Sequence, residues 1–538
     1  MAAHRLALVI ESPSKDDEFL LLKQPRPPKF HDEQYDSFVD SDLWDLPSAQ
    51  LNLLLPDSDP SLLVEVAPSH AEFKDFDFRK FDIRSALNEV FGQLGYGAVE
   101  GGGWKFLKYV KEAAFGPDLP VNTVFVGGKL VAAEDKNSID SYRWMSIQSC
   151  VNWIQELKPC GDRVGPLVVL GLINESSFST KWKVPPAINH QEYPPGVIII
   201  PMRSRTLKPF STTNLVVFAP ENVPNNSEEN NFVASGDALI VDPGCLSEFH
   251  VEFDVAYAKA KISHLFECND LNFFYSGLSV IQKCNPDAIL LAHEKTMHRI
   301  SRDDWSLGYT SVTGDEDIVI GGHRLRAIYA PGHTDGHMAL LHANSHSLIV
   351  GDHCLGQGSA VLDPRAGGNM SKKATFFQFA KQWNLFDKVG MESGTAFGDP
   401  CDIKLENNIV GAAAGIHLAL QREYFQTTYN FLELSPHALI PMHGRVNVWP
   451  KQMLCGYLKN RRSREANILK AIEGGAKTLF DIVEYVYSDV DRGVWVAASA
   501  NVRLHMDHLA QEHKLPKDFS LETYNSSLVT FVDNVGKL

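Results

Sequence analysis

Three short apolar runs in the middle of the chain each lead into a loop that carries histidine or aspartate. The loops read Pro-Gly-His-Thr at His333, Gly-Asp-His at Asp352 and Pro-Met-His-Gly at His443. Folds of the α/β class place binding and catalytic side chains in such loops at strand ends, and imidazole nitrogens with a carboxylate are ligands that Zn²⁺ prefers. We therefore predict α/β layers in this region and one metal-binding cleft on which His333, Asp352 and His443 converge.

The length and the alternation of patterns predict several domains. At about 100–200 residues per domain, the 538 residues suggest about three. Strand and helix patterns alternate through the middle region, which is typical of α/β layers, whereas the region after it is mainly helical. We expect domains over residues 1–184, 200–455 and 460–515, with a linker over 185–201 and a tail over 516–538.

Composition narrows the classes of function. The formal net charge of −16 argues against wholesale nucleic-acid or membrane binding, although a local basic patch stays compatible with it. We find no run of about 18 apolar residues that would span a membrane, and no signal or transit peptide. The 8 cysteines form no Cys-x-x-Cys pair, so we expect neither a thiolate zinc site nor disulfides. A reducing compartment is expected, the cytoplasm first and an organelle matrix as the alternative.

The first domain shows strand and helix patterns that resemble the Nudix fold. A Nudix box ends in Arg-Glu-x-x-Glu-Glu-x-Gly, and residues 88–95 align best with it: Glu89 and Gly95 match, but Gly92 and Gln93 stand at the metal-carboxylate positions. One carboxylate does not carry that metal, so the resemblance implies a catalytically degenerate α/β domain. The expected elements are a hairpin of strands over 6–10 and 18–24, a helix over 83–94, two strands over 122–131 joined at Gly127-Gly128, and a helix over 151–157.

The His/Asp loci, in this order and with Asp242 ahead of them, resemble the metallo-β-lactamase superfamily over about residues 200–455. The resemblance implies an αββα sandwich that binds one or two zinc ions. It implies that His333 binds the first metal, that Asp352 bridges both and that His443 binds the second. Asp242 and Asp352 would be the catalytic carboxylates, Asp242 by supporting the site through hydrogen bonds. The whole arrangement resembles a plant-type form of the superfamily, with a Nudix-like domain in front and a winged helix behind.

One motif of that superfamily is missing. Two-metal hydrolysis needs ligands beyond the three loci, and the superfamily supplies four of them from a His-x-His-x-Asp-His loop. Counted back from Gly277, the four places fall on Asn269, Leu271, Phe273 and Phe274, none of which is a usual zinc ligand. The resemblance thus implies a metal-dependent hydrolase, and the missing loop implies little or no hydrolase activity from this chain.

A second departure is the segment 372–422, which lies outside the resemblance. A segment of that length without a recognisable pattern is unusual inside a compact domain. We interpret it as an insertion that arose from a translated intron or an alternative splice form, and the lost ligand loop can have the same origin.

The C-terminal region resembles the winged-helix domain that follows the metal domain in such proteins. We expect three short helices over 468–472, 479–486 and 502–509 and a wing over 494–497, with Thr478 and Asp481 forming a capping box at the second helix. Candidate contacts to nucleic-acid phosphates stand at the entry of this domain, and the alternative is a solvated helix face. They are Lys459, Arg461, Arg462 and Arg464.

Two classes of function remain open at this level. In the first, the chain is a metal-dependent hydrolase of single-stranded RNA phosphodiesters or, alternatively, of a small-molecule ester or thioester such as a glutathione conjugate. In the second, it is a non-catalytic product that acts only through binding. We expect no membrane partner, and the oligomeric state stays open.

Overall fold

The computed structural model divides the chain into two compact units. The first comprises Met1–Tyr329, Met338–Gln357 and Leu434–Met453, and the second comprises Ala330–His337, Gly358–Glu433 and Leu454–Leu538. The residues whose structure is described are 2–30, 32–54, 76–95, 103–129, 141–156, 161–174, 189–204, 210–218, 238–244, 262–267, 276–356, 423–492, 495–529 and 531.

The first unit begins with a mixed sheet in the order β5-β6-β1-β2-β3-β8, with β4 paired to β1 and β7 paired to β2. The antiparallel pair of β1 (Ala3–Glu11) and β2 (Glu18–Lys23) confirms the predicted hairpin. The other elements are β3 (Leu43–Asp45), β4 (Ser48–Gln50), β5 (Lys105–Lys111), β6 (Val121–Lys129), β7 (Tyr142–Ser146), β8 (Arg163–Val164), α1 (Ile83–Gln93), α2 (Ile147–Gln155), α3 (Pro166–Val168), a π-helical turn (Val169–Ile173) and 3-10 turns at Glu33–Tyr35 and Phe78–Lys80.

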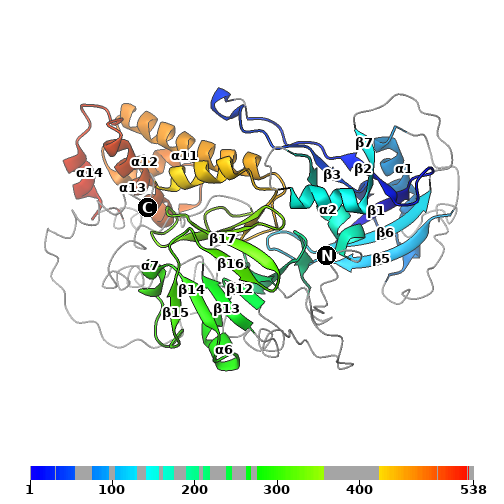
Figure 1. The fold of residues 1–538 in the computed structure, drawn as a ribbon. Helices are drawn as coiled ribbons and strands as arrows, with labels where there is room; N and C mark the ends of the chain where they lie inside the picture. Colours follow the sequence, from blue (N-terminus) through cyan, green and yellow to red (C-terminus); the bar gives the residue numbers. More distant parts are fainter. Residues whose placement is uncertain are drawn as a thin grey trace. The chain divides into compact units, whose positions relative to one another are not determined.

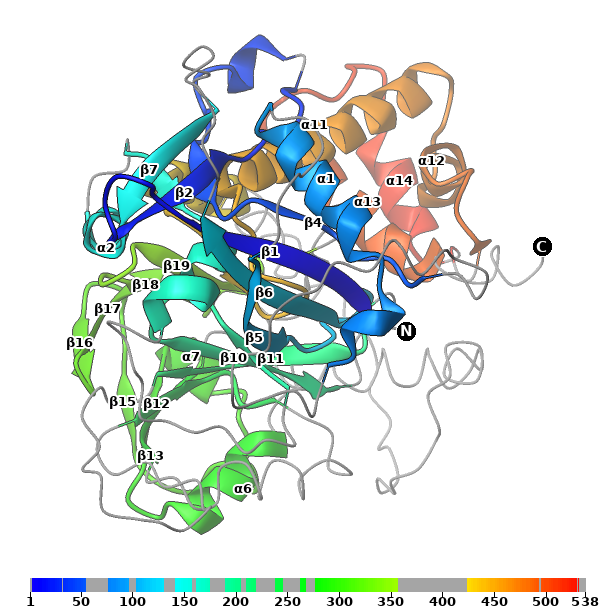
Figure 2. The same cartoon turned by 90° about the vertical axis from the view of Figure 1, so that its right-hand side faces the viewer.

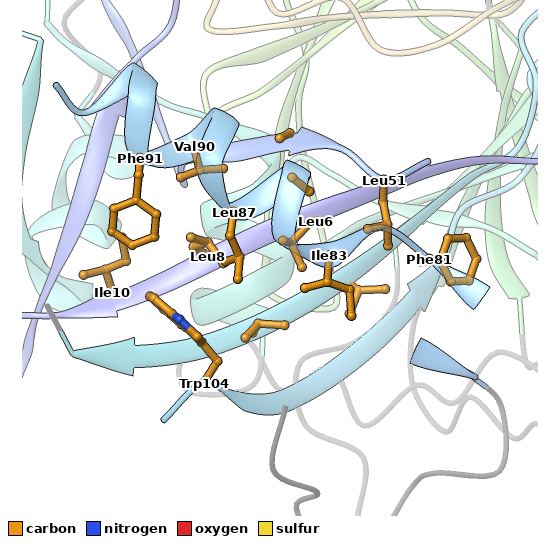
Figure 3. Close-up of a cluster of buried hydrophobic side chains, with 14 of the residues drawn as sticks. Leu6, Leu8, Ile10, Leu51, Phe81, Ile83, Leu87, Val90, Phe91 and Trp104 are labelled. Atoms are coloured by element: carbon orange, nitrogen blue, oxygen red, sulfur yellow. The ribbon is translucent and has the colours of Figure 1, made fainter. Parts of the chain in front are cut away.

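Helix α1 covers one face of this sheet beside β1 (Figure 2), as the amphipathic pattern predicts. Figure 3 shows Leu87 and Val90 of the helix pointing toward Leu6 and Leu8 of β1, with Trp104 closing the same cluster. All five side chains are buried. Burial of this apolar face, at roughly 25 cal/mol per Å², is what fixes the helix on the sheet.

The prediction of two strands joined at Gly127-Gly128 is wrong, because both glycines lie inside the continuous strand β6. That strand pairs in parallel with β1 along its whole length. A Cβ on Gly128 would lie 2.7 Å from the ring of Trp104, and one on Gly127 would lie 3.0 Å from the side chain of Leu107. Close packing against the Trp104 ring, and not a turn, therefore accounts for Gly128.

Two further sheets form a sandwich in the middle of the chain. The larger has the order β15-β14-β13-β12-β11-β10-β9 and the smaller β16-β17-β18-β19-β20; Figure 1 shows β12, β13 and β14 side by side. The elements are β9 (Gln191–Glu192), β10 (Val197–Arg203), β11 (Thr212–Phe218), β12 (Ala238–Val241), β13 (Ile262–Glu267), β14 (Ile289–Ala292), β15 (Tyr309–Ser311), β16 (Asp317–Ile320), β17 (His323–Tyr329), β18 (Met338–His342), β19 (Ser347–Gly351), β20 (Leu439–Pro441), α6 (Ser276–Cys284) and α7 (Glu294–Met297).

Strand β10 shows how these layers pack. Its Val197 and Ile199 belong to the core between the two sheets, whereas Ile198 and Ile200 pack on the other face against α6. A strand buried on both faces reads as a continuous apolar run. The structure describes the predicted linker over 185–201 only from residue 189 onward. Most of residues 189–201 is strand, so the linker prediction is wrong there.

The carboxyl ends of β17, β19 and β20 meet at one edge of the smaller sheet. β17 and β19 are each antiparallel to β18, and β20 is parallel to β19, so these three strands run in the same direction. Asp352 follows β19 directly, and His443 follows β20. The topology therefore brings these two chemistry-bearing loops to one edge, where α/β folds carry their sites.

In the second unit, α12 (Leu479–Val486), α13 (Trp495–Gln511) and α14 (Leu521–Ser527) pack on one apolar core with the end of α11 (Pro450–Glu473). The capping box of Thr478 and Asp481 is confirmed. The expected short helix over 468–472 is the last part of the 24-residue α11. The expected wing over 494–497 is wrong from residue 495 onward, because α13 begins there. Among the described residues, no helix has the length and apolar character needed to cross a membrane.

Asp45 is a buried carboxylate that holds the first sheet to α3. Its Oδ1 accepts hydrogen bonds from the Leu46 N–H at 3.0 Å and the Val168 N–H at 2.9 Å. Burial raises the pKa of Asp45 to about 6, although these bonds act in the opposite direction. Since the folded pKa lies above the ordinary value of 3.8, ionisation of Asp45 costs stability in the folded state.

We predict that Asp45→Asn changes the pH dependence of stability. Protonated Asp45 in the wild type contributes to the free energy of unfolding, and this contribution is fully present below pH 4. It is lost as the pH rises through about 6, and its total size is on the order of 3 kcal/mol. When the pH rises from 4.5 to 7.5, the urea midpoint of the wild type should therefore fall relative to that of Asp45→Asn. Tryptophan fluorescence follows the unfolding. The exposed Asp17→Asn is the control, and equal pH slopes in all three proteins would contradict the prediction.

Candidate metal centre

Asp352 and His443 lie together at the edge of the smaller sheet. His443 Nε2 is 3.2 Å from Asp352 Oδ1. Both residues are buried: Asp352 is 4 % exposed and His443 is 5 % exposed. The reason is topological, because each residue leaves the end of one of two neighbouring parallel strands. The structure thus brings together two of the three side chains predicted to converge.

A backbone carbonyl fixes the tautomer of His443. Its Nδ1 lies 2.8 Å from the carbonyl oxygen of Thr212, and a carbonyl accepts but does not donate, so Nδ1 carries the proton. When the ring is neutral, Nε2 then presents a lone pair to Asp352. A lone-pair nitrogen and a carboxylate oxygen at this distance attract each other only through a shared cation, either a proton or a metal ion.

The loop that carries His443 is fastened by Asn214. The Asn214 Nδ2 donates to the carbonyl oxygens of Pro441 at 2.8 Å and Gly444 at 2.7 Å, and the Asn214 N–H donates to Met442 at 2.7 Å. Gly444, at φ 88, also lies so close to Gly356 that a Cβ would reach 2.8 Å from its Cα. These constraints hold the imidazole in place before any ligand arrives.

Asp242 is the predicted supporting carboxylate, and it has an unusual backbone. It follows β12 directly and is 5 % exposed, and its φ of 49 is in the region that non-glycine residues rarely adopt. The Gly244 N–H donates to the carbonyl oxygen of Asp242 at 2.7 Å and closes this turn. Such strain is concentrated at functional sites. The role of Asp242 at the metal centre stays a prediction.

His333 belongs to the second unit, in a tightly bonded loop. The Ala330 N–H donates to His337 at 3.0 Å, and His337 Nδ1 returns a bond to the Ala330 carbonyl at 3.1 Å. Burial lowers the pKa of His337 to about 4, so its ring is neutral at pH 7. His333 is 3 % exposed, and its ring centroid is 5.7 Å from that of His337. Its convergence with Asp352 and His443 stays a prediction.

The donor set fits a metal ion only in part. His443 Nε2 and Asp352 Oδ1 are zinc ligand types, but structural and catalytic zinc sites use at least three protein ligands. Within the described ranges, no three side chains of His, Cys, Asp or Glu are grouped so that they could hold a metal. The predicted positions of the missing ligand loop, 269–274, and the insertion 372–422 lie outside the described residues.

The predicted basic contacts are not equivalent. Arg461 is 4 % exposed, and its guanidinium lies 3.9 Å from the ring centre of Tyr424. A buried guanidinium stacked on a ring does not reach a phosphate from solvent, so Arg461 is removed from the predicted row. Arg462 Nη2 donates to Tyr429 Oη at 2.6 Å. The hypothesis of phosphate contacts therefore narrows to Lys459, Arg462 and Arg464.

A buried cluster in the second unit escaped the sequence analysis. Glu465 Oε1 on α11 accepts from His508 Nδ1 at 2.8 Å and lies 3.4 Å from His505 Nδ1, both on α13. Burial alone would raise the pKa of Glu465, but the bonds from the two histidines hold it at about 2. The spacing of His505 and His508 places both on one helix face, which was the signal available in the sequence. The cluster joins two helices and has no assigned chemistry.

We predict that Asn214→Asp loosens the His443 loop. A carboxylate of the same shape cannot donate to the carbonyls of Pro441 and Gly444 and repels both, at a cost of about 2–4 kcal/mol. Thermal unfolding measures this loss. Asn344→Asp is the matched control, because the Asn344 Oδ1 only accepts a bond, from the Arg324 N–H at 2.9 Å. An Asn214 variant as stable as this control would show that the clamp is unimportant.

Comparison with known proteins gives one family model and several relatives. Residues 478–518 match the model of the beta-lactamase associated winged helix domain. The Beta-lactamase-like protein 2 homolog of Drosophila melanogaster is 24% identical over 204 residues, which are 37% of this chain and 50% of that protein. The Lactamase-like protein vrtG of Penicillium aethiopicum is 31% identical over 78 residues, 14% of this chain and 25% of that protein. The chain thus matches half or less of the length of these relatives.

Solved structures resemble the chain at low identity. A metallo-beta-lactamase family protein from Thermus thermophilus is 15% identical, with 59% of this chain and 94% of that chain covered and a TM-score of 0.41. A beta-lactamase domain protein from Burkholderia ambifaria is 14% identical, with 64% and 94% covered and a TM-score of 0.43.

The curated relatives and the family model agree with the motifs that the sequence analysis singled out. The winged helix predicted for the C-terminal region is confirmed by the model that matches there. The finer assignments, a Nudix-like first domain and a plant-type form, stay predictions. Together the matches support the metallo-β-lactamase superfamily for this chain, with a mixed α/β fold and a C-terminal beta-lactamase associated winged helix domain.

Proposed function

We propose that this protein is built on a metal-dependent hydrolase scaffold whose metal centre is incomplete, so that the chain has little or no hydrolase activity. The pair of His443 and Asp352 carries the proposal. The Thr212 carbonyl fixes the imidazole in the form that a metal ligand needs. The 3.2 Å approach of these two acceptor atoms is favourable when a cation lies between them.

A metal ion at this centre would be held by His443 Nε2 and a carboxylate oxygen of Asp352, with His333 as the proposed third ligand. When bound, zinc would lower the pKa of a water ligand and polarise the bond to be cleaved. The protein's own contribution is orientation, because Asn214 fixes the His443 loop and Asp242 stands in a strained turn at the end of β12. At the four positions of the superfamily's ligand loop the sequence has Asn269, Leu271, Phe273 and Phe274.

The substrate class favoured for such a scaffold is single-stranded RNA, cleaved at its phosphodiesters. The winged-helix match supports it, as do the three cations left in the predicted row, Lys459, Arg462 and Arg464. The net charge of −16 opposes it. A small-molecule ester or thioester is the alternative substrate, and the cytoplasm or an organelle matrix is the proposed compartment.

The second candidate function is binding without catalysis. It is favoured by the missing His-x-His-x-Asp-His loop. The box around Glu89 keeps one of the Nudix metal carboxylates, which favours a non-catalytic role for the proposed Nudix-like domain as well. In this function the scaffold keeps its packing and loses its reaction.

We predict that the purified chain, dialysed against zinc and then against buffer, holds fewer than two zinc ions per molecule. His443→Ala should remove the zinc that remains, since it deletes a proposed ligand. The exposed His298→Ala, which removes an imidazole that is not a predicted ligand, is the matched control. Elemental analysis gives the stoichiometry. Two zinc ions in the unaltered chain would refute the proposal, and zinc retained by His443→Ala would refute the ligand assignment.

A gain-of-ligand variant tests the same proposal from the other side. The quadruple change Asn269→His, Leu271→His, Phe273→Asp and Phe274→His rebuilds the missing motif at its expected spacing. If the scaffold is otherwise intact, this variant should bind two zinc ions and cleave a fluorescent single-stranded RNA more than about 100-fold faster than the parent chain, as the metal contributes several kcal/mol. A folded variant that binds two zinc ions but cleaves neither RNA nor a thioester would leave the hydrolase scaffold without support.

A further inference from the structure

The connection between β5 and β6, residues 112–119, links the first sheet to the sandwich. Its Ala113 and Phe115 are buried in the core between the two sandwich sheets, and Phe115 has 0% exposure. This core also contains Met442, the residue before His443. A loop of the N-terminal domain therefore forms part of the wall behind the candidate metal centre.

The same connection binds the residue that follows the metal loop. Arg445 Nη2 donates to the carbonyl oxygens of Ala113 at 3.1 Å and Leu119 at 2.9 Å. The guanidinium lies 5.1 Å from the ring centre of Phe115, and Nη1 is 3.6 Å from Glu112 Oε1. A planar guanidinium with several fixed donors is well suited to hold two separate carbonyls at once. The chain just after His443 is thus tied to the N-terminal domain.

The connection also touches the segment on the other side of His443. A Cβ placed on Gly116 would lie 2.5 Å from Ser211 Oγ, so a larger residue here would force the Ser211 side chain to move. Ser211 precedes Thr212, whose carbonyl accepts the bond from His443 Nδ1. The 112–119 connection therefore contacts the chain beside both partners of the His443–Thr212 bond. It meets Ser211 next to Thr212, and it binds Arg445 two residues after His443.

Further contacts from the N-terminal domain extend along the same segment. The guanidinium of Arg163 bonds to the carbonyl oxygens of Val448 and His437, the latter at 3.1 Å, on either side of the His443 loop. The carboxylate of Asp40 accepts the N–H groups of Lys451 and Gln452 at the start of α11. The sequence segment from 437 to 452 is held at several points, with His443 between them.

We propose that the 112–119 connection, acting through Arg445 and Gly116, is a positioning element that keeps His443 Nδ1 on the Thr212 carbonyl and turns Nε2 toward Asp352. It deepens the proposed function, since the tautomer matters only if His443 serves as a ligand. The N-terminal domain then has a task that needs no catalytic carboxylates of its own. Arg445 is a positioning residue, because it acts on His443 through the backbone.

The tautomer of His443 tests this proposal in the metal-free protein. The full chain is labelled with [¹⁵N]histidine and kept in a chelator, and the ring nitrogen shifts report which nitrogen carries the proton; the signals of His443 are those lost in His443→Asn. Arg445→Met keeps the length of the side chain and removes its donors. Loosening the Nδ1 bond should lower the ratio of the Nδ1–H to the Nε2–H form by about five-fold, the effect of one ordinary hydrogen bond.

Arg143→Met is the matched control. Arg143 also pairs with a carboxylate, Asp162 at 2.8 Å, and stacks on a ring, that of Trp44 at 3.6 Å, but these partners belong to β3 and to the residue before β8, not to the 437–452 segment. An unchanged tautomer ratio in folded Arg445→Met, or an equal change in Arg143→Met, would overturn the proposal. If Arg445→Met does not fold, Arg445→Lys, which cannot span both carbonyls, and Gly116→Ala take its place with the same expected direction. Because no metal is present, this outcome is independent of the zinc stoichiometry that tests the proposed function.

Discussion

The hydrogen bond between His443 Nδ1 and the Thr212 carbonyl decides what the centre can do. In the neutral ring it leaves the proton off Nε2, and this nitrogen lies 3.2 Å from Asp352 Oδ1. A bond of this kind is useful only if both partners are fixed, because a mobile loop would sample both tautomers. The rigidity comes from Asn214 on one side of the loop and from the pairing of β19 with β20 beneath it.

The N-terminal sheet and the sandwich share more than a covalent link. One buried cluster joins Leu21, Trp44 and Phe125 of the first sheet to Ala438, the residue before β20. Another places Phe115 between the sandwich sheets. Both regions belong to a single compact unit. Two buried clusters therefore join the first sheet to the sandwich across the domain boundary expected near residue 184.

The sequence was informative wherever chemistry and secondary structure coincide locally. A ligand-type residue directly after an apolar strand is visible in the sequence, and so Asp352 and His443 could be found. Their partner Thr212 acts through its backbone, which no residue type encodes. The turn predicted at Gly127-Gly128 is wrong because glycine occurs both in turns and where a strand packs closely on another group. Only the position of the Trp104 ring shows that close packing applies here. Arg461 misled because Tyr424, which buries it, comes from a distant part of the chain.

The buried pair also bears on how polar groups are satisfied at the edge of the smaller sheet. Two buried polar groups cost stability unless each has a partner. His443 is satisfied on one side by Thr212, and on the other it faces Asp352 at 3.2 Å. A cation shared between Nε2 and Oδ1 turns this approach of two acceptors into an attraction. The packing behind His443, made by Thr212, Asn214 and Arg445, therefore holds this geometry through the protein's own contacts.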